Sequence, residues 1–243
     1  MYGLGTLINV AAIVVGGLIG MLAGKILTER FQKIVTVAMG LSVLTMSISG
    51  IVSEMLKVTD EGVATGGTYV IIFSLVLGAL SGEFIDIDGK MEKFGKWLKK
   101  KTGNARDPVF VDGFLDASFT VCIGAMAVMG AIMDGIEGDI SILLTKSILD
   151  FVIILIMTAS MGKGCIFSAI PVGILQGSVT LLSRLIMPLM NDAAMSCLSM
   201  VGSILIMCVG INLLGDGKFR IKVANLLPSI VFAVAAAYIP LLS

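Results

Sequence analysis

Long apolar runs separated by short polar segments follow one another along the whole chain. A transmembrane helix needs about 20 mostly apolar residues to cross about 30 Å of hydrocarbon, and this length selects about eight runs. They cover approximately residues 5–27, 34–56, 66–84, 112–133, 140–160, 164–186, 193–214 and 223–241. The pattern therefore predicts an all-α polytopic membrane protein with about eight transmembrane helices, in a single transmembrane domain over residues 1–243.

The composition agrees with a membrane protein and excludes an ordinary soluble domain. Of the 243 residues, 57% are hydrophobic and only 14% are charged, whereas a soluble domain has about 25% charged residues. The 17 Lys plus Arg balance the 17 Asp plus Glu, so the chain lacks the basic excess that nucleic-acid binding requires. It has no histidine, and its four cysteines have no C-x-x-C spacing, so neither a metal site nor a disulfide framework is expected.

The basic residues of the connecting segments alternate from loop to loop, and so indicate an orientation. They follow the first, third, fifth and seventh runs: Lys25, Arg30 and Lys33; seven Lys and Arg from Lys90 to Arg106; Lys163; and Lys218, Arg220 and Lys222. The loops after the second and fourth runs are acidic. Because Lys and Arg are retained on the cytoplasmic side of a membrane, both termini are predicted to lie outside.

Residues 86–101 are too charged to span a membrane, but they have the pattern of an amphipathic helix. Ile87, Met91, Phe94 and Leu98 share one stripe, with basic residues opposite. One interpretation is a cytoplasmic interfacial helix whose lysines meet anionic lipid. The other is a solvated connector with ordinary cytoplasmic charge.

Small residues recur every four positions on two of the runs. They are Ala12, Gly16, Gly20 and Gly24 on the first run, and Ser74, Gly78 and Gly82 on the third. In lipid, small residues let helix backbones approach closely, so both faces are predicted helix contacts. The contacts lie either within one chain or across a homodimer, and a homodimer is our expectation.

A weak internal repeat is also present. Residues 3–52 align without gaps on residues 164–213, and each half is followed by one more apolar run. This alignment matches the first run to the sixth, which is an odd offset. The two halves, 3–84 and 164–241, therefore have opposite orientations in the membrane, around central helices at 112–160. Inverted repeats of this kind are common in secondary transporters, whose binding sites lie near the membrane midplane.

Charged residues inside the apolar runs are the strongest candidates for function. Lys146 and Asp150 lie one helical turn apart on the fifth run and therefore on one face. A charge at the centre of a membrane costs at least about 2.5–3.5 kcal/mol and usually faces a cavity or a partner. Asp150 is a candidate for binding a proton or cation, and Lys146 for an anionic group. The alternative is an ion pair that only holds helices together.

The fourth run is the second candidate site. It carries Asp116, Ser118 and Thr120 and is interrupted by Gly124 and Gly130. This composition is typical of a broken or re-entrant helix, whose free backbone groups can hold an ion. The alternative is a bent, tightly packed span whose hydroxyls bond back to their own helix. Further polar candidates within apolar runs are Asn9, Gln176 and Asn212.

Several stretches resemble one known family. They are Phe119-Thr-Val-Cys-Ile-Gly-Ala-Met126, Asp134-Gly-x-x-Gly-Asp139, Leu144-Thr-Lys-Ser-Ile-Leu-Asp150, Gln176-Gly-Ser-Val-Thr-Leu-Leu182 and Gly210-Ile-Asn-Leu-Leu214, with Gly5-Thr-Leu-Ile-Asn9 and Gly78-Ala-Leu-Ser-Gly-Glu83. Together they resemble the bacterial membrane-protein family known as domain of unknown function 554, over nearly the whole chain. The resemblance implies a transporter-like protein of the bacterial inner membrane and gives no substrate.

The sequence contains no signature of an enzyme: it has no Walker loop, nucleophile elbow or catalytic triad. We therefore expect a secondary transporter of a small polar or charged solute, without a cofactor, coupled to H⁺ or Na⁺. The candidate binding residues are Asp150, Lys146, Asp116, Ser118, Thr120, Gln176, Asn212 and Asn9. The alternatives are an ion channel, or a membrane scaffold or sensor that transports nothing.

Overall fold

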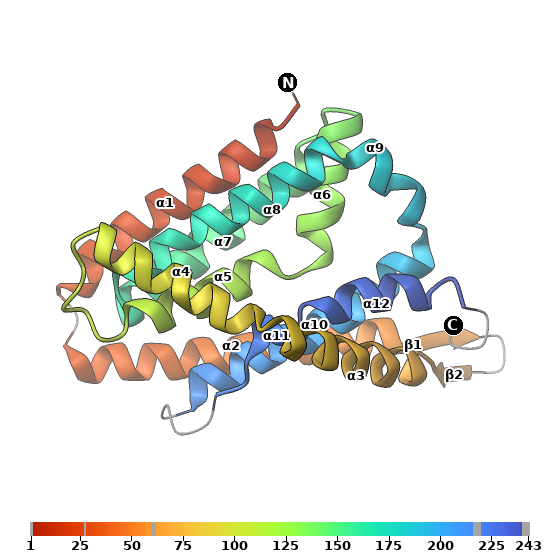
Figure 1. Cartoon of the computed structure of the whole chain (residues 1–243), viewed down its shortest axis with the longest axis horizontal. Coiled ribbons are helices and arrows are strands. Elements are labelled where there is room, and N and C mark those ends of the chain that lie inside the picture. The colour runs from red at the N-terminus through yellow and green to blue at the C-terminus, as the bar shows by residue number, and fades with distance from the viewer. Residues whose placement is uncertain (1, 27, 60–61, 216–219, 240–243) are drawn as a thin grey trace.

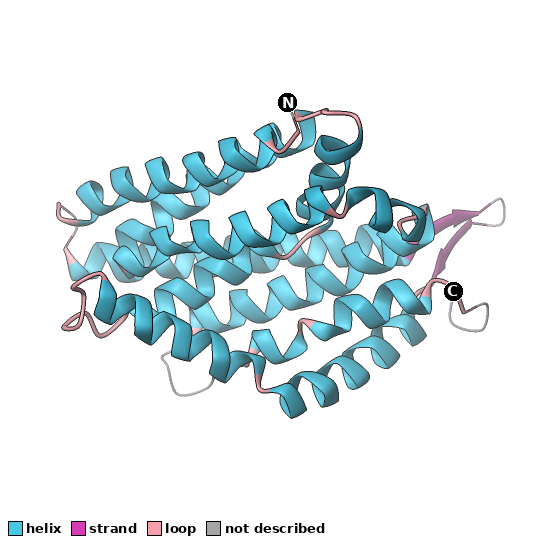
Figure 2. Cartoon of the chain, turned by 45° about the horizontal axis from the view of Figure 1, so that its top comes forward, coloured by secondary structure: helices cyan, strands magenta, loops and turns pink. Residues whose placement is uncertain are grey.

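The computed structural model describes residues 2–26, 28–59, 62–215 and 220–239, and it consists almost entirely of helices (Figures 1 and 2). The helices are α1 (Leu4–Gly24), α2 (Glu29–Met55), α3 (Thr68–Ile85), α4 (Ile87–Lys101), α5 (Phe110–Cys122), α6 (Ala125–Ile136), α7 (Ser141–Met161), the 3-10 helix η1 (Lys163–Ser168), α8 (Ala169–Leu181), α9 (Ser183–Ile186), the 3-10 helix η2 (Met187–Leu189), α10 (Asp192–Leu214), α11 (Val223–Leu226) and α12 (Pro228–Ala236). Three parts of the sequence predictions lie outside the described residues: residue 27 of the first run, residues 240–241 of the last run, and the loop residue Lys218.

The all-α polytopic fold is confirmed. Six described helices are long and apolar enough to cross a membrane, and the bent pair α5 and α6 gives a seventh candidate. The last predicted run is divided, because α11 ends before Pro228 and α12 begins with it. Proline lacks the N–H that a continuous helix would need at this position. The resulting apolar segment, Val223–Ala236, is shorter than the others, so eight spans remain a prediction.

A short antiparallel hairpin, which the sequence pattern did not predict, separates the second and third apolar helices. Strand β1 (Leu56–Thr59) pairs with β2 (Gly62–Thr65) in the register Leu56↔Thr65 and Thr59↔Gly62. Valine and threonine, which favour extended backbone, supply several of these positions. The hairpin projects from one end of the bundle (Figure 2).

The described helices pack in two groups. In the first group, α1 lies along α7 and also contacts α8. In the second group, α2 lies along α10, and α3 lies along α12. Helix α2 contacts α7 directly, and helices α5 and α6 contact α7, α8 and α10, so the two groups are connected (Figure 1).

The two small-residue faces are used inside the chain. Gly16, Gly20 and Gly24 of α1 face the backbone carbonyls of Phe151, Leu155 and Ala159, so α1 and α7 run parallel. Gly78 and Gly82 of α3 face Ser229 and Asn225, so α3 and the α11–α12 segment run antiparallel. Any Cβ at these glycines would collide with its neighbour. Because both faces are occupied within one chain, they give no support to a homodimer, which remains a prediction.

The predicted break in the fourth run is confirmed. Helices α5 and α6 meet at an angle of 61°. Ile123 is extended, and Gly124 has φ 145° and ψ 151°, a conformation that a side chain would strain. The chain therefore changes direction within a segment whose composition otherwise suits one membrane span.

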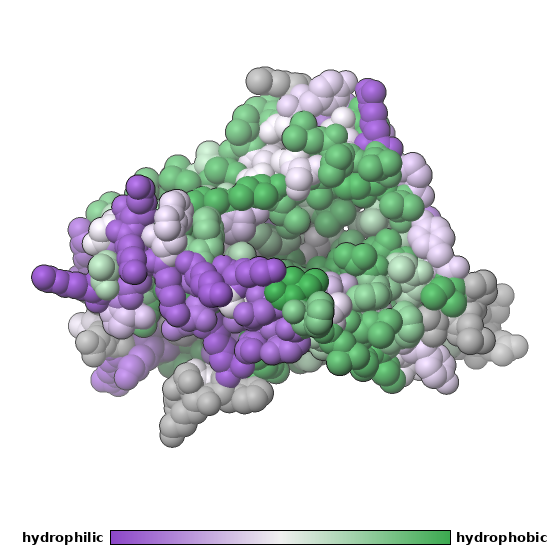
Figure 3. Space-filling model, viewed as in Figure 1, coloured by the Kyte–Doolittle hydropathy of each residue, from purple (hydrophilic) through white to green (hydrophobic). Residues whose placement is uncertain are grey.

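Helix α4 confirms the predicted amphipathic helix. Its apolar stripe packs mainly against other helices of the protein. Gly95 and Leu98 are buried, and the ring of Phe94 lies 5.9 Å from that of Phe114 in α5. Its lysines form part of a hydrophilic patch at one end of the molecule (Figure 3). The location of α4 at the membrane interface, and contact between its lysines and lipid headgroups, remain predictions.

The amino-terminal end of α1 is held by a carboxylate from α6. Asp134 is fully buried, and its two oxygens accept hydrogen bonds from Gly3 N at 3.1 Å and Gly5 N at 3.0 Å. A negative charge at a helix N-terminus satisfies free N–H groups and complements the helix dipole. We expect Asp134→Ala to lower the free energy of unfolding by about 1–2 kcal/mol, as measured by reversible unfolding in mixed detergent.

The exposed Glu137 offers a matched control, since Glu137→Ala removes the same charge three residues away. It is expected to change stability by less than about 0.5 kcal/mol. Equal effects of the two substitutions would contradict a specific role of Asp134 in anchoring α1.

Candidate functional site

Four predicted site residues from three helices meet in one buried cluster, which we call the four-residue network: Asn9 of α1, Lys146 and Asp150 of α7, and Gln176 of α8. Lys146 Nζ donates to both oxygens of Asp150 at 2.8 Å. Asn9 Nδ2 donates to Asp150 Oδ2 at 3.0 Å and to Gln176 Oε1 at 3.3 Å. The three helices are thus joined by side chains as well as by apolar packing.

Local sequence explains how these side chains reach one another. Lys146 and Asp150 are four residues apart, so both side chains leave the same face of α7. Glycines on α1 bring its backbone against the backbone of α7, and this short separation lets the small Asn9 side chain reach Asp150. Where α1 and α8 cross, a Cβ at Gly173 would lie 3.3 Å from the side chain of Val10.

Burial makes the charged pair energetically significant. The side chains of Lys146 and Asp150 are only 9% and 3% exposed. Two buried opposite charges attract strongly, but removing them from water costs several kcal/mol for each ion. The second contact of Asp150, with Asn9, satisfies more of its hydrogen-bonding capacity. The pair is therefore held as a neutral unit.

The network is only partly satisfied among the described residues. Asn9 Oδ1 and Gln176 Nε2 are buried and have no hydrogen-bond partner there. The same holds for the hydroxyls of Thr6 and Thr180, which lie about one turn away on α1 and α8. Buried polar atoms normally have partners. One acceptor, one donor and two hydroxyls therefore remain available to a polar ligand or to water.

A groove runs along the contact between α1 and α8. Its volume is 980 Å³, and its lining includes Thr6, Val10, Gly173, Gly177 and Thr180. Asn9 and Gln176 lie between these residues in the sequence; Asn9 Nδ2 donates to both Asp150 and Gln176.

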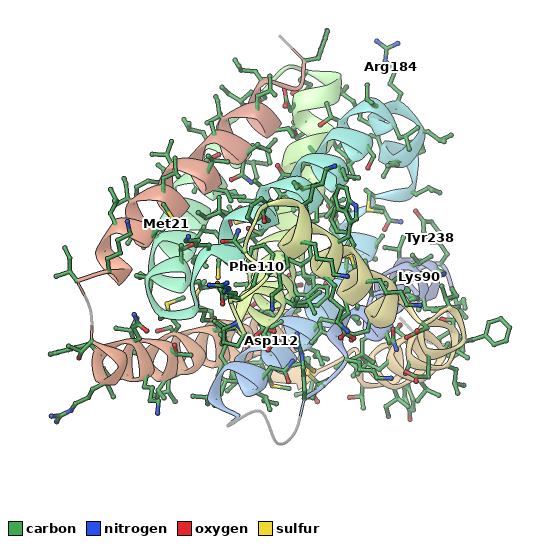
Figure 4. All side chains as sticks on the ribbon, turned by 60° about the vertical axis from the view of Figure 1, so that its left-hand side comes forward. Met21, Lys90, Phe110, Asp112, Arg184 and Tyr238 are labelled. Carbon is green, nitrogen blue, oxygen red and sulfur yellow. The ribbon has the colours of Figure 1, made fainter. Side chains whose placement is uncertain are left out.

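At one end the groove reaches Arg184, whose side chain points away from the bundle (Figure 4). Thr6 and Thr180 thus belong to the groove and also neighbour the network. The groove therefore lies beside the network, whose four residues are not among its lining residues.

The network lies well inside the apolar part of α7. Asp150 is nine residues from Ser141, about 14 Å along a helix with a rise of 1.5 Å per residue. This is close to the middle of the 21-residue helix, whose length matches the hydrocarbon core. Such a depth is typical of binding sites in secondary transporters.

Two other predicted residues make only local contacts. Ser118 Oγ donates to Phe114 O at 2.6 Å, and Thr120 Oγ1 donates to Asp116 O at 2.7 Å. Both hydroxyls bond back to α5, as the alternative interpretation of this run proposed. Ser118 also lines a separate apolar cavity of 620 Å³.

The remaining two predicted residues lie in a different cluster, where the chain between α10 and α11 returns to the bundle. Arg220 pairs with Asp112 and also reaches Asp116, at 3.4 Å. Asn212 exchanges hydrogen bonds of 2.8 and 2.9 Å with the backbone of Ile221. Asp116 and Asn212 therefore help to fasten this segment, away from the four-residue network.

A second ion pair strengthens the same attachment. Lys222 Nζ lies 3.1 Å from Glu83 Oε1, and Asn225 Nδ2 donates to Glu83 Oε2 at 2.6 Å. The neighbouring Glu83 carboxylate raises the pKa of Lys222 above its ordinary value. These contacts join the end of α3 to α11.

The sequence analysis missed Thr6 and treated Asp134 only as a loop acid. Thr6 lies three residues before Asn9, on the adjoining part of the same helical surface, and this spacing was the available signal. No group of three or more His, Cys, Asp or Glu within the described ranges could hold a metal ion. The polar atoms of the network are amide, carboxylate and ammonium groups.

Comparisons with known proteins match the chain to one family model and to two relatives. A family model described as "Protein of unknown function (DUF554)" matches residues 4–238. The "Uncharacterized membrane protein YdfK" of Bacillus subtilis is 27% identical over 237 residues, covering 97% of this chain and 96% of its own length. The "Uncharacterized protein YqgA" of Escherichia coli is 27% identical over 238 residues, covering 95% of this chain and 94% of its own. No solved structure matches the chain.

Proposed function

The chain belongs to the DUF554 family of membrane proteins, and we propose that it is a secondary transporter of a small polar or charged solute. Its membrane is the bacterial cytoplasmic membrane, with both termini outside. The observation that carries the proposal is the four-residue network, in which a buried ion pair adjoins polar atoms that have no partner among the described residues. The coupling ion is H⁺ or Na⁺.

Energetics favour a binding role for the pair. An intramembrane charge is expensive and is typically retained where it binds an ion or substrate. If the pair only held helices together, the protein would be more stable with every neighbouring buried polar atom hydrogen-bonded, because each unsatisfied buried polar group costs about 1–3 kcal/mol. Asn9 Oδ1 and Gln176 Nε2 do not meet that condition within the described structure.

The arrangement of helices is compatible with two inverted halves. Each helix of the first half contacts the helix that the repeat matches to it: α1 with α8, α2 with α10, and α3 with α12. In each of these contacts the two helices run antiparallel. This is the pairing expected around a two-fold axis in the membrane plane, and it supports a transporter plan.

The orientation proposal rests on the ends of the helices. The C-terminal ends of α1, α4, α7 and α10 lie toward one side of the molecule (Figure 1). Lys25 follows α1, Lys163 follows α7, and Lys99 lies in the last turn of α4. Basic residues at one end support its placement on the cytoplasmic side.

The proposal predicts that a transported solute stabilises the protein through the network. We expect thermal unfolding of the purified protein, screened against salts and small metabolites at several pH values, to shift upward by about 5–10 °C at 100 times the dissociation constant. Asp150→Asn and Lys146→Ala should each change the shift, because each removes one charge of the site, and Asp150→Asn should abolish it for a cationic solute.

Asp116→Asn is the matched control, since it also neutralises a buried carboxylate inside an apolar segment, but one that lies near Arg220. It should retain the shift. If no solute stabilises the wild type while both α7 variants are less stable, the pair is structural and the scaffold alternative gains support.

A further inference from the structure

We infer that the apolar cavity between α4, α8 and α12 binds an acyl chain of one anionic phospholipid, whose phosphate headgroup lies against the lysines of α4. The cavity has a volume of 620 Å³, within the range of about 300–1,000 Å³ that is usual for ligand sites. No residue of the four-residue network lines it. The lipid site is therefore separate from the proposed solute site and does not depend on which solute is transported.

The cavity lies where the two groups of helices meet. Helix α8 of the first group contributes Ile174 and Leu175 to its lining, and α12 of the second group contributes Ile230 and Val231. The bend between α5 and α6 contributes Gly124. Side chains around an empty space lose the van der Waals contacts that a packed interior provides. A hydrocarbon chain in the cavity would restore such contacts to both groups at once.

The lining suits hydrocarbon better than a polar solute. Among the described residues that line the cavity, none has a charged side chain. Its two hydroxyls already bond to their own helices: Ser118 Oγ donates to Phe114 O at 2.6 Å, and Ser178 Oγ donates to Leu175 O at 2.8 Å. A polar solute would lose its hydrogen bonds with water and find few replacements, whereas apolar cavities stay dry and bind apolar molecules. The occupant is therefore apolar where it enters the protein.

The cavity opens on a surface that is itself apolar. Ile174 and Val231 belong to its lining and are also 66% and 70% exposed, so they form part of its rim. Figure 3 shows this face hollowed between apolar surfaces, with the hydrophilic side chains of α4 beside the hollow. Exposed apolar surfaces of this kind are typical of contact with a membrane. The bilayer would therefore supply the occupant, and its apolar component is the acyl chain of a lipid.

Helix α4 connects the cavity to the level of the lipid headgroups. Phe94 lines the cavity, and the ring of Trp97 stacks on it with the ring centres 5.7 Å apart. Trp97 is 55% exposed and is the single tryptophan of the chain. Tryptophan favours the boundary between hydrocarbon and headgroups. One turn of α4 thus spans from the cavity wall to the place where a headgroup would lie.

The charge of α4 selects an anionic headgroup. The helix carries six lysines and only two acidic residues. Lys96 pairs with Glu92 at 2.5 Å. Lys90 and Lys93 are exposed, and neither pairs with an acidic side chain within the described part of the chain. Basic residues at a membrane surface attract anionic lipids, so these two lysines are the proposed partners of the phosphate.

Competition between two lipids tests the cavity. We would mix the purified full-length protein, in detergent, with equal amounts of phosphatidylglycerol and phosphatidylcholine that carry the same acyl chains, and count bound lipids by native mass spectrometry. One phosphatidylglycerol per chain should bind in preference to phosphatidylcholine. Val128→Phe enlarges a side chain of the lining and should weaken binding of both lipids about tenfold. Val76→Phe, at an exposed position of α3 outside the cavity, is the matched control and should bind as the wild type does.

A pair of double variants tests the headgroup. Lys90→Gln with Lys93→Gln should reduce the preference for phosphatidylglycerol by about fivefold for each lysine, the equivalent of about 1 kcal/mol. Binding of phosphatidylcholine should not change. Arg30→Gln with Lys33→Gln removes the same charge from exposed positions of α2 and should leave the preference as it is.

A second cavity variant keeps the test decisive if Val128→Phe does not fold. Val231 is an exposed residue of the rim, so Val231→Phe should fold, and it should weaken binding of both lipids in the same direction. Undiminished binding to the cavity variants that fold would mean that lipid meets only the lysines, and would overturn the site. Equal binding of the two lipids to the wild type would overturn it as well. Neither result bears on the solute screen, so the lipid site and the proposed transporter can fail separately.

Discussion

Replacing Lys146 alone with methionine is expected to lower the free energy of unfolding by about 3–5 kcal/mol. The substitution leaves the Asp150 carboxylate buried, with Asn9 as its remaining partner. Its charge must then either remain uncompensated or be neutralised by a proton, and both consequences cost free energy. Asp150→Leu should cost a similar amount, because it leaves the ammonium of Lys146 in the same apolar surroundings.

The double substitution, Lys146→Met with Asp150→Leu, is expected to recover most of this loss. Replacing both members of a buried ion pair by apolar residues of similar size is often neutral or stabilising. Reversible unfolding in mixed detergent would give the free energies of the wild type and the three variants, and hence the coupling energy of the pair. Additive effects would contradict a direct interaction between Lys146 and Asp150.

The same variants separate stability from binding. A double variant that regains wild-type stability but binds no solute would show that the charged pair is kept for its ligand. A double variant that loses neither stability nor ligand binding would remove the four-residue network from the proposed mechanism.

Gly20→Leu is expected to have the other large effect, a loss of several kcal/mol or failure to fold. A Cβ at Gly20 would collide with the backbone carbonyl of Leu155, and the Cβ of Thr158 would lie only 3.0 Å away. Overpacking inside a tight contact typically costs about 1–3 kcal/mol when only side chains must move. Here the obstacle is backbone, so α1 and α7 would have to separate, and the contact between Asn9 and Asp150 would be lost with them.

Gly177→Ala provides the matched control, because a Cβ at Gly177 meets nothing within 4 Å. Gly177 is also within a helix, α8, so replacement by alanine should be neutral or stabilise by up to about 1 kcal/mol. Unfolding of both variants in the same detergent would test this contrast. If Gly20→Leu were as stable as Gly177→Ala, close contact between α1 and α7 would not be what holds the first group together.

The fold class and the four residues of the network could be predicted from the sequence because both depend on local pattern. Apolar runs of membrane-spanning length predicted the helices, and a four-residue spacing put Lys146 and Asp150 on one face. Polar side chains are conspicuous in apolar runs, which singled out Asn9 and Gln176. Glycines in the fourth run likewise predicted the break at Gly124.

The remaining features depend on which helices become neighbours, and local pattern does not contain that information. Asn9 and Gln176 are 167 residues apart, so nothing near either of them indicates their contact. Asp116 was a candidate in the second predicted site, and nothing near it in the sequence indicates its contact with Arg220, 104 residues away. The short helix α12 shows a different limit, because Pro228 interrupts a run whose hydropathy alone suggests one continuous span.

All four side chains of the network belong to α1, α7 and α8, and none comes from α2, α3, α10 or α12. A ligand bound by Asn9, Asp150 and Gln176 is therefore contacted from one group of helices. If that group shifted as a rigid body against the other, these contacts would travel with it unbroken. Access from the two sides of the membrane could then change by displacement of the whole site, as in an elevator, rather than by opening and closing around a stationary ligand.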